Sequence, residues 1–142
     1  MRIESHKGTK LSRDEALESL ARTVVDCGYR LHQDLGPGLL ETAYEMLMFD
    51  QLSKRGLRVA RQVFVPLRYD GVVVDNAFKI DLLVENRLVV ELKSTEKLAP
   101  VHGKQVLTYL RLMNLPLGLL MNFGEGLFRN GVKRIANDYS GG

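Results

Sequence analysis

The stretch KIDLLVENRLVVELK, residues 79–93, decides the predicted fold. Two apolar runs flank Glu85, Asn86 and Arg87, which is the pattern of a β-hairpin. A three-residue loop, with Asn86 or its neighbour at positive φ, makes one face of the hairpin entirely apolar. The pairs on that face are Ile80 with Leu92, Leu82 with Val90 and Val84 with Leu88. A two-residue turn mixes charge and hydrocarbon on both faces, and a one-residue slip flips every side chain, so the apolar face selects the longer loop.

The same register places three charged side chains on the opposite face. Asp81 stands opposite Glu91, and Lys93 lies on the same side because side chains alternate with period two. Like charges that face each other across strands are destabilising, so the two carboxylates need compensation. One interpretation is a divalent cation such as Mg²⁺, which binds one or two carboxylates together with waters and substrate phosphates. The other is an exposed face on which Lys79 and Lys93 neutralise the acids.

Hydrophobic periodicity predicts two helices before this hairpin. An S-x-x-E capping pattern at residues 12–15 begins a first helix of about residues 13–34, and the Gly-Pro-Gly sequence at residues 36–38 ends it. A second helix has one apolar stripe and stops at Gly56. The stripe consists of Leu40, Ala43, Tyr44, Leu47, Met48 and Leu52.

Strand-like runs and one more helix complete the predicted architecture. Residues 63–69 and 72–74 read as strands joined by a tight turn at Asp70-Gly71, and Pro66 suits an edge strand. The segments expected after the hairpin are a helix at about residues 101–113, a strand at 117–123, an edge strand within 127–135 and a flexible tail at 137–142. The order of elements predicts a mixed α/β fold with helices packed against a largely antiparallel sheet.

Length and composition exclude several classes of protein. The chain has 142 residues, 45% of them apolar and 26% charged, which is typical of one globular domain. A single cysteine, Cys27, cannot form an intramolecular disulfide, so a reducing compartment fits best. No apolar run approaches the ~18 residues of a membrane span. We therefore expect a cytoplasmic protein without a membrane partner, whose net charge of +3 is compatible with a polyanionic partner but does not require one.

Polar side chains on two of the predicted helices extend the candidate site. Glu41 lies at the edge of the apolar stripe of the second helix, from which it can face the sheet. Gln105 and Tyr109 stand one turn apart on the helix after the hairpin and share a face. They form either a surface hydrogen-bonding pair or part of the site. We expect helix-start or structural roles for His102, His32 and Cys27.

The segment GLLETAY at residues 38–44 fits the pattern G-x-x-E-x-x-Y. With it, residues 24–135 resemble the bacterial and archaeal GxxExxY family, which is placed in the PD-(D/E)XK nuclease superfamily. The resemblance includes further residues in the same order, which are Leu35-Gly36-Pro37-Gly38, Asp81, Glu91-Leu92-Lys93, Gln105, Tyr109 and Met121-Asn122-Phe123-Gly124. This ordered set is much more specific than a lone E-x-K. Ile80 occupies the place of the motif's proline, a substitution that removes no catalytic group.

The resemblance implies a fold and a metal site. The fold is a restriction-endonuclease-like αβββαβ core with a mostly antiparallel central sheet flanked by helices, here with an extra N-terminal helix, in a single domain with its core at about residues 24–135. One or two Mg²⁺ or Mn²⁺ ions are implied. Their ligands would be Asp81, Glu91 and the backbone carbonyl of Leu92, with Glu41 bound through water or to a second ion.

The resemblance also implies catalytic roles. Glu41, Asp81, Glu91 and Lys93 are the implied catalytic residues, and Lys93 would orient or help deprotonate the attacking water and stabilise the phosphorane-like transition state. Gln105 and Tyr109 resemble the Q-x-x-x-Y element that positions the site and the substrate backbone.

The leading hypothesis is therefore a Mg²⁺-dependent nuclease that hydrolyses nucleic-acid phosphodiester bonds, with DNA preferred over RNA by analogy. The alternative is a non-catalytic nucleic-acid-binding or protein-interaction module that keeps the nuclease fold. A basic surface for that module would involve Arg129, Lys133 and Arg134. A third interpretation is a homodimer, or a complex with a protein partner, that supplies the substrate grip of the accessory domains found in many nucleases.

Overall fold

The computed structural model describes residues 6–139, and the side chains of residues 15–139. Its elements in chain order are α1 (His6–Leu35), α2 (Glu41–Lys54), β1 (Val59–Tyr69), β2 (Val72–Val84), β3 (Leu88–Lys93), α3 (Pro100–Met113), β4 (Leu117–Asn122), the 3₁₀-helix η1 (Phe128–Gly131) and β5 (Val132–Ala136). From α2 to β4 the order is αβββαβ, with α1 added before it and β5 after it. The predicted mixed α/β fold with flanking helices is confirmed.

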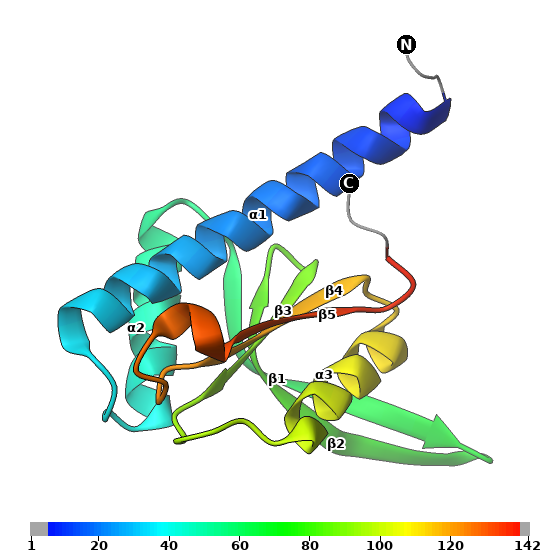
Figure 1. Cartoon of the computed structure of the whole chain (residues 1–142). Helices are drawn as coiled ribbons and strands as arrows, with labels where there is room; N and C mark the ends of the chain where they lie inside the picture. The colour runs from blue at the N-terminus through cyan, green and yellow to red at the C-terminus, as the bar shows by residue number, and fades with distance from the viewer. Residues whose placement is uncertain (1–5, 140–142) are drawn as a thin grey trace.

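The five strands form one sheet in the order β1-β2-β3-β4-β5. The β3–β4 pair is parallel and the other three pairs are antiparallel, so the sheet is mostly antiparallel as predicted. Helices α1 and α2 share a hydrophobic core with one face of the sheet, and α3 packs in a second core against the other face (Figure 1). Strand β1 lies at the sheet edge, where Pro66 coincides with a register irregularity between Val65 and Leu67.

Three predicted boundaries differ from the structure. Helix α1 begins at His6, so residues 12–15 lie inside it and do not cap it. An S-x-x-E spacing also fits a helix interior, and residues 6–11 contain no proline that would stop the helix earlier. The runs at 72–74 and 78–84 belong to one strand, β2. The strand expected within residues 127–135 is a turn of 3₁₀-helix followed by the short strand β5.

Leu40 also differs from its prediction, because 77% of its surface is exposed. It precedes the first helical residue of α2 in an extended conformation, so the helical stripe that buries Tyr44, Met48 and Leu52 does not extend to it. As predicted, α2 stops before Gly56, which has a φ of 86°, a conformation that glycine adopts without strain. In the expected tail, Asn137 donates to the carbonyl of Leu115 at 3.1 Å, and residues 140–142 lie outside the described residues.

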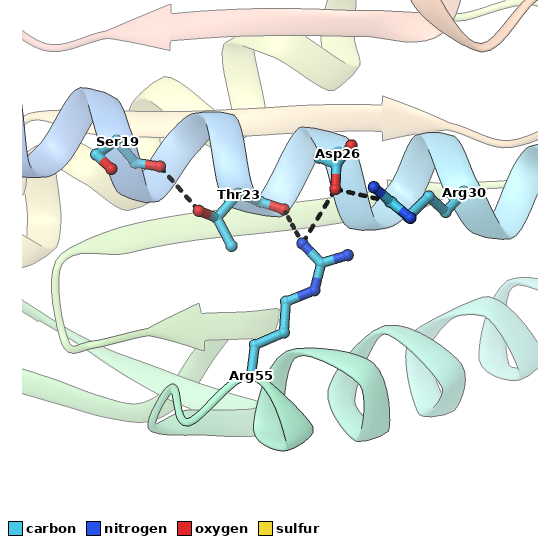
Figure 2. A network of polar contacts seen from close by, with 5 residues as sticks. All are labelled: Ser19, Thr23, Asp26, Arg30 and Arg55. Atoms are coloured by element: carbon cyan, nitrogen blue, oxygen red, sulfur yellow. Dashed lines mark hydrogen bonds and ion pairs between the residues drawn. The ribbon is translucent and has the colours of Figure 1, made fainter.

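An exposed polar network joins α1 to the end of α2 (Figure 2). The Arg55 guanidinium donates to the Thr23 carbonyl at 3.3 Å and to the Asp26 carboxylate at 3.2 Å. Asp26 also accepts a hydrogen bond from Arg30, one helical turn later, at 2.9 Å. The network holds the two helices in register on the same face of the sheet. Although α1 is 30 residues long, neither it nor another helix in the described part of the chain is long and apolar enough to span a membrane.

Candidate active site

Strands β2 and β3 separate at Asp81 and Glu91, and we call this point the fork. The predicted loop is confirmed, with Glu85 and Asn86 at φ values of 54° and 53°, and the ladder pairs Val84 with Leu88 and Leu82 with Val90. It ends there: the predicted pair of Ile80 with Leu92 is not part of the ladder. Ile80 packs in the core under α3, whereas Leu82 packs in the core under α1 and α2. The prediction of one continuous apolar face is therefore wrong beyond Leu82.

The end of the β2–β3 ladder coincides with a distortion of β1, the other neighbour of β2. Gln62, opposite Asp81 in the β1–β2 hairpin, has a φ of 53°, an unfavourable conformation for a residue with a side chain. The flanking pairs, Arg61 with Leu82 and Val63 with Ile80, keep the register of the hairpin on either side of this distortion. The regular alternation of side chains is thus interrupted beside Asp81, so that Leu82 and Ile80 pack in different cores.

Side chains replace the missing backbone ladder between β2 and β3. The Asp81 N–H donates to Glu91 Oε1 at 3.2 Å, and the Leu92 N–H donates to Asp81 Oδ2 at 2.8 Å. Each carboxylate therefore accepts a hydrogen bond from the backbone of the opposite strand, through only one of its two oxygens. The structure brings Asp81 and Glu91 together, as the register analysis expected.

Burial makes this pair of acids hard to ionise. It raises the pKa of Asp81 to about 6, with further increases from the charges of Glu45 and Glu41. Burial raises the pKa of Glu91 to about 8, and the neighbouring Asp81 carboxylate adds to the effect. The Lys93 ammonium lowers the pKa of both groups, but its effect is smaller than that of burial. A positive charge is therefore needed to keep both acids ionised at neutral pH.

The chain after Lys93 is held by the loop that follows β4. The Lys93 carbonyl accepts a hydrogen bond from the Phe123 N–H at 2.8 Å. The Asn122 side chain accepts from the Thr95 N–H at 3.0 Å and donates to the Thr95 carbonyl at 2.8 Å. Gly124 lies so close that an added Cβ would come within 2.1 Å of the Thr95 carbonyl oxygen. The Met-Asn-Phe-Gly sequence at 121–124 thus fixes the backbone around Lys93.

Helix α2 brings two further acids to the same place. Glu41 is exposed, and its charge contributes to the raised pKa values of Asp81 and Glu91. Glu45, one turn later, is buried and was not identified from the sequence. Its Oε2 accepts hydrogen bonds from Arg61 Nε at 3.2 Å and Nη2 at 3.1 Å, and its Oε1 accepts one from the Gln62 side chain. The i,i+4 spacing of Glu41 and Glu45 was the available signal, because such residues share a helix face.

Tyr44, the tyrosine of the G-x-x-E-x-x-Y sequence, has a structural role. Its hydroxyl donates to the Gly36 carbonyl at 2.5 Å and accepts from the Leu39 N–H at 3.3 Å. Its ring stacks on Phe123 with a centroid distance of 4.2 Å. The tyrosine thus connects the Gly-Pro-Gly loop before α2 to the loop after β4, and thereby places Glu41 relative to Lys93.

The two predicted residues of α3 are placed differently from each other. Tyr109 is buried and contacts Phe78 edge-on at a centroid distance of 5.3 Å. Burial, followed by the charges of Glu91 and Asp81, raises the pKa of Tyr109 to about 12, so the phenol stays protonated beside the acids. Gln105 is exposed, and neither Gln105 nor Tyr109 is among the residues that line the cleft described next.

An open cleft of about 420 Å³ contains the acids and their neighbours. Its charged lining consists of the acids Glu41, Glu45, Asp81 and Glu91 and the cations Arg61, Lys79 and Lys93. The remaining lining residues are Thr42 and Gln62. The cleft lies where α2, β1, β2 and β3 meet, and the preceding hydrogen bonds hold five of its lining side chains, those of Glu45, Arg61, Gln62, Asp81 and Glu91.

Comparison with protein families supplies the assignment that geometry alone does not. Residues 18–135 match the family model of the PD-(D/E)XK nuclease superfamily. The chain belongs to this superfamily. No curated protein and no solved structure matches the chain. Its five-stranded sheet with flanking helices is consistent with the restriction-endonuclease-like fold, and membership indicates nuclease activity on a nucleic-acid substrate.

The carboxylates of Asp81 and Glu91 fit a divalent cation. Within the described part of the chain, no three His, Cys, Asp or Glu side chains are grouped closely enough to hold an ion by themselves. The donors at the fork are instead two carboxylates, which matches the preference of Mg²⁺ for one or two carboxylates completed by waters and phosphates. Burial raises the pKa of Asp81 and of Glu91, and a cation bound between them would favour their ionised forms. PD-(D/E)XK nucleases typically use divalent metals.

His32, His102 and Cys27 are not among the residues that line this cleft, and they have local roles. His102 Nδ1 accepts a hydrogen bond from the Ala99 N–H at 3.1 Å, at the start of α3. His32 is buried, with Nε2 2.7 Å from the Glu125 carbonyl oxygen, and Cys27 lies in the core under α1. These positions agree with the structural roles expected for them.

Proposed function

We propose that this member of the PD-(D/E)XK superfamily is a nuclease that uses Mg²⁺ or Mn²⁺ to hydrolyse phosphodiester bonds, with DNA as its substrate. The observation that carries the proposal is the buried carboxylate pair at the fork of β2 and β3, with Lys93 in the same cleft. Two buried acids with raised pKa values are unfavourable for the fold by themselves. A bound cation would stabilise the ionised forms of both carboxylates and offset their mutual repulsion.

In this proposal Asp81 and Glu91 hold the ion, the Leu92 backbone carbonyl is a third ligand, and Glu41 binds through water. When bound, the metal acts as a Lewis acid on a phosphoryl oxygen and lowers the pKa of water. Asp81 and Glu91 each have one carboxylate oxygen outside the hydrogen bonds that cross the fork. Exposed Glu41 is close enough to influence both acids yet is free of their burial, which suits contact through a water.

Lys93 is the residue proposed to act on the attacking water and on the developing phosphate charge. Its ammonium lowers the pKa of Asp81 and of Glu91, so its charge is felt at both acids. A fixed cation at this place stabilises a transition state that carries more negative charge than the substrate. Protonated Tyr109 approaches the same acids from α3 and, with Gln105, is proposed to position the site and the substrate backbone.

The narrower assignments follow from the sequence resemblance. The G-x-x-E-x-x-Y segment supports membership of the GxxExxY family, since Tyr44 connects the two loops that flank the cleft. We also propose a cytoplasmic location and, for substrate grip, a homodimer or a protein partner. The alternative of a purely binding module has less support, because Arg134 of its basic surface is paired with Glu18 at 2.7 Å.

A cleavage assay tests the proposed activity. Linear duplex, circular duplex and single-stranded DNA, and RNA, are incubated with the protein in Mg²⁺, in Mn²⁺ or in a chelator. We expect cleavage only with metal, and a loss of roughly 100-fold or more in Lys93→Ala. Lys97→Ala is the matched control, because it removes the same charge from an exposed position outside the cleft.

Full activity in folded Lys93→Ala would contradict the assigned role of the lysine. Salt-sensitive binding without cleavage in either metal would instead favour the non-catalytic nucleic-acid-binding module.

A further inference from the structure

Arg61 is the most firmly held cation of the cleft. Two of its N–H groups donate to Glu45 Oε2, at 3.2 and 3.1 Å, and its guanidinium carbon lies 5.6 Å from the centre of the Phe49 ring. Both partners belong to α2, whereas Arg61 belongs to β1. The position of the guanidinium is therefore fixed from two sides before any ligand arrives.

Glu45 has no evident use other than to hold β1. Only 6% of its side chain is exposed, and both of its oxygens accept hydrogen bonds from consecutive β1 residues, Arg61 and Gln62. A buried carboxylate is costly unless it is paired and hydrogen-bonded, so this arrangement keeps the Arg61 guanidinium at the wall of the cleft. It also holds Gln62 in the positive-φ conformation beside Asp81.

The guanidinium still presents donors to the cleft. Arginine has five N–H donors in a fixed planar fork, and the ion pair with Glu45 uses two of them. The side chain is 34% exposed, in contrast to its buried partner, and it lines the same cleft as Asp81, Glu91 and Lys93. Its outward side is thus available to an anion in the cleft.

A nucleic acid would need such a cation here. Without a bound metal the cleft has four carboxylates and three cations, so the acids repel a polyanion, and phosphates adjacent to the reacting one need fixed donors of their own. Lys93 is placed among the acids. Lys79 is an exposed residue of β2, and its Nζ lies 6.0 Å from the centre of the Phe64 ring. Arginine binds phosphate with a rigid fork, whereas lysine acts as a point charge.

We propose that Arg61 binds a backbone phosphate next to the one that is cleaved, and that Glu45 is the positioning residue that aims its guanidinium. The inference rests on the proposed nuclease function, to which it adds a substrate contact on β1. The Glu45–Arg61 pair thereby has two effects: it ties β1 to α2, and it presents a preformed phosphate site at a fixed distance from the acids.

Salt-dependent binding separates a phosphate contact from a purely structural role. Fluorescent DNA and RNA duplexes are titrated with wild type, Arg61→Met and Arg58→Met in a chelator, over a series of NaCl concentrations. Removal of one phosphate contact reduces the slope of log K against log salt by about one. We expect this change in Arg61→Met, with binding at least about tenfold weaker at fixed salt.

Arg58→Met is the matched control for this titration. It removes an arginine that is also ion-paired, to Glu85, but that is 76% exposed and is not among the cleft residues. Its slope and affinity should equal those of wild type. The double variant Glu45→Gln/Arg61→Met addresses folding, because it removes the phosphate contact without leaving Glu45 as a buried unpaired charge.

The outcomes distinguish this inference from the proposed function. If wild type binds and the folded double variant has the same slope and affinity, Arg61 does not contact phosphate, and the nuclease proposal is unaffected. If wild type neither binds nor cleaves any of the nucleic acids, both proposals fail. A slope that is reduced in both Arg61 variants and unchanged in Arg58→Met supports the phosphate site.

Discussion

Two carboxylates of α1 and the two carboxylates at the fork of β2 and β3 have opposite pKa shifts. On α1, hydrogen bonds from arginines lower the pKa of Glu18, through Arg134, and of Asp26, through Arg30. At the fork of β2 and β3, burial raises the pKa of Asp81 to about 6 and of Glu91 to about 8. The side chains of the first two acids are 22% and 46% exposed and have cationic partners, whereas the other two share a more deeply buried position with each other.

This difference separates acids that serve the fold from acids that serve a ligand. A carboxylate with a lowered pKa is more stable ionised in the folded chain than in the unfolded chain, so it contributes to stability at neutral pH. A carboxylate with a raised pKa has the opposite effect, and its retention needs another reason. The fork acids have such a reason if they bind a cation.

The largest effect is expected from Glu91→Gln, which tests whether the fork acids lower the stability of the fold but are needed for cleavage. Cleavage should fall by roughly 100-fold or more because one of two proposed metal ligands is lost. At pH 9 the variant should be more stable than wild type, since it removes the repulsion between Glu91 and Asp81. Thermal unfolding in chelator measures stability, and Glu18→Gln is the control with the opposite expected sign.

A Glu91→Gln variant that loses activity and is also less stable than wild type at pH 9 would contradict this prediction. It would mean that the hydrogen bond from the Asp81 N–H to Glu91 contributes more to the fold than the charge repulsion removes from it.

The next effect is the pH dependence of the metal-free protein. Both fork acids bind protons more tightly in the folded chain than at their ordinary pKa values of 3.8 and 4.5. The folded chain therefore holds more protons than the unfolded chain between about pH 4 and pH 8, and its free energy of unfolding should fall as pH rises through this range. The double variant Asp81→Asn/Glu91→Gln should lack this part of the slope.

Addition of Mg²⁺ makes this second prediction specific to the site. An ion that binds only the folded chain stabilises it, by about 2.7 kcal/mol at a concentration 100 times the Kd. Wild type should gain most at pH 8, where the acids are ionised, and the double variant should gain nothing. An equal gain in both proteins would place the bound metal elsewhere.

Much of the fold was predictable because local patterns determine it. The apolar faces on either side of residues 85–87 fixed the hairpin loop, and the Gly-Pro-Gly break separated α1 from α2 as expected. Asp81 and Glu91 lie close together as expected, but through hydrogen bonds from their side chains to the facing backbone and not as the predicted cross-strand pair. Their roles in catalysis remain predictions.

The rest of the site depends on contacts between distant segments. The fork coincides with the distortion of β1 at Gln62, which is held by Glu45 of α2 opposite Asp81, and no alternation of side chains within residues 79–93 indicates this. Arg61 was missed for the same reason, since its partner lies 16 residues earlier on another element. A pattern within one hairpin predicts pairing, but it cannot predict where the pairing ends beside a distorted neighbouring strand.

The smallest effect is expected at Glu18, one of the two α1 acids with a lowered pKa. The Glu18 carboxylate accepts hydrogen bonds from Arg134 at 2.7 Å and from the Tyr139 hydroxyl at 2.8 Å. Because the pair is accessible to water, Glu18→Gln should lower the free energy of unfolding at pH 7 by less than about 1 kcal/mol, as measured by urea unfolding, with cleavage unchanged.

The pH dependence of that loss gives the decisive sign. The lowered pKa means that the contribution of Glu18 is complete above its ordinary value of 4.5 and disappears as pH falls through its folded value. Wild type and Glu18→Gln should therefore converge in acid, whereas wild type and the fork variants diverge as pH rises toward 8. A Glu18 effect that grew with pH above 6 would show that the α1 acids and the fork acids are one electrostatic system, and the contrast between them would not hold.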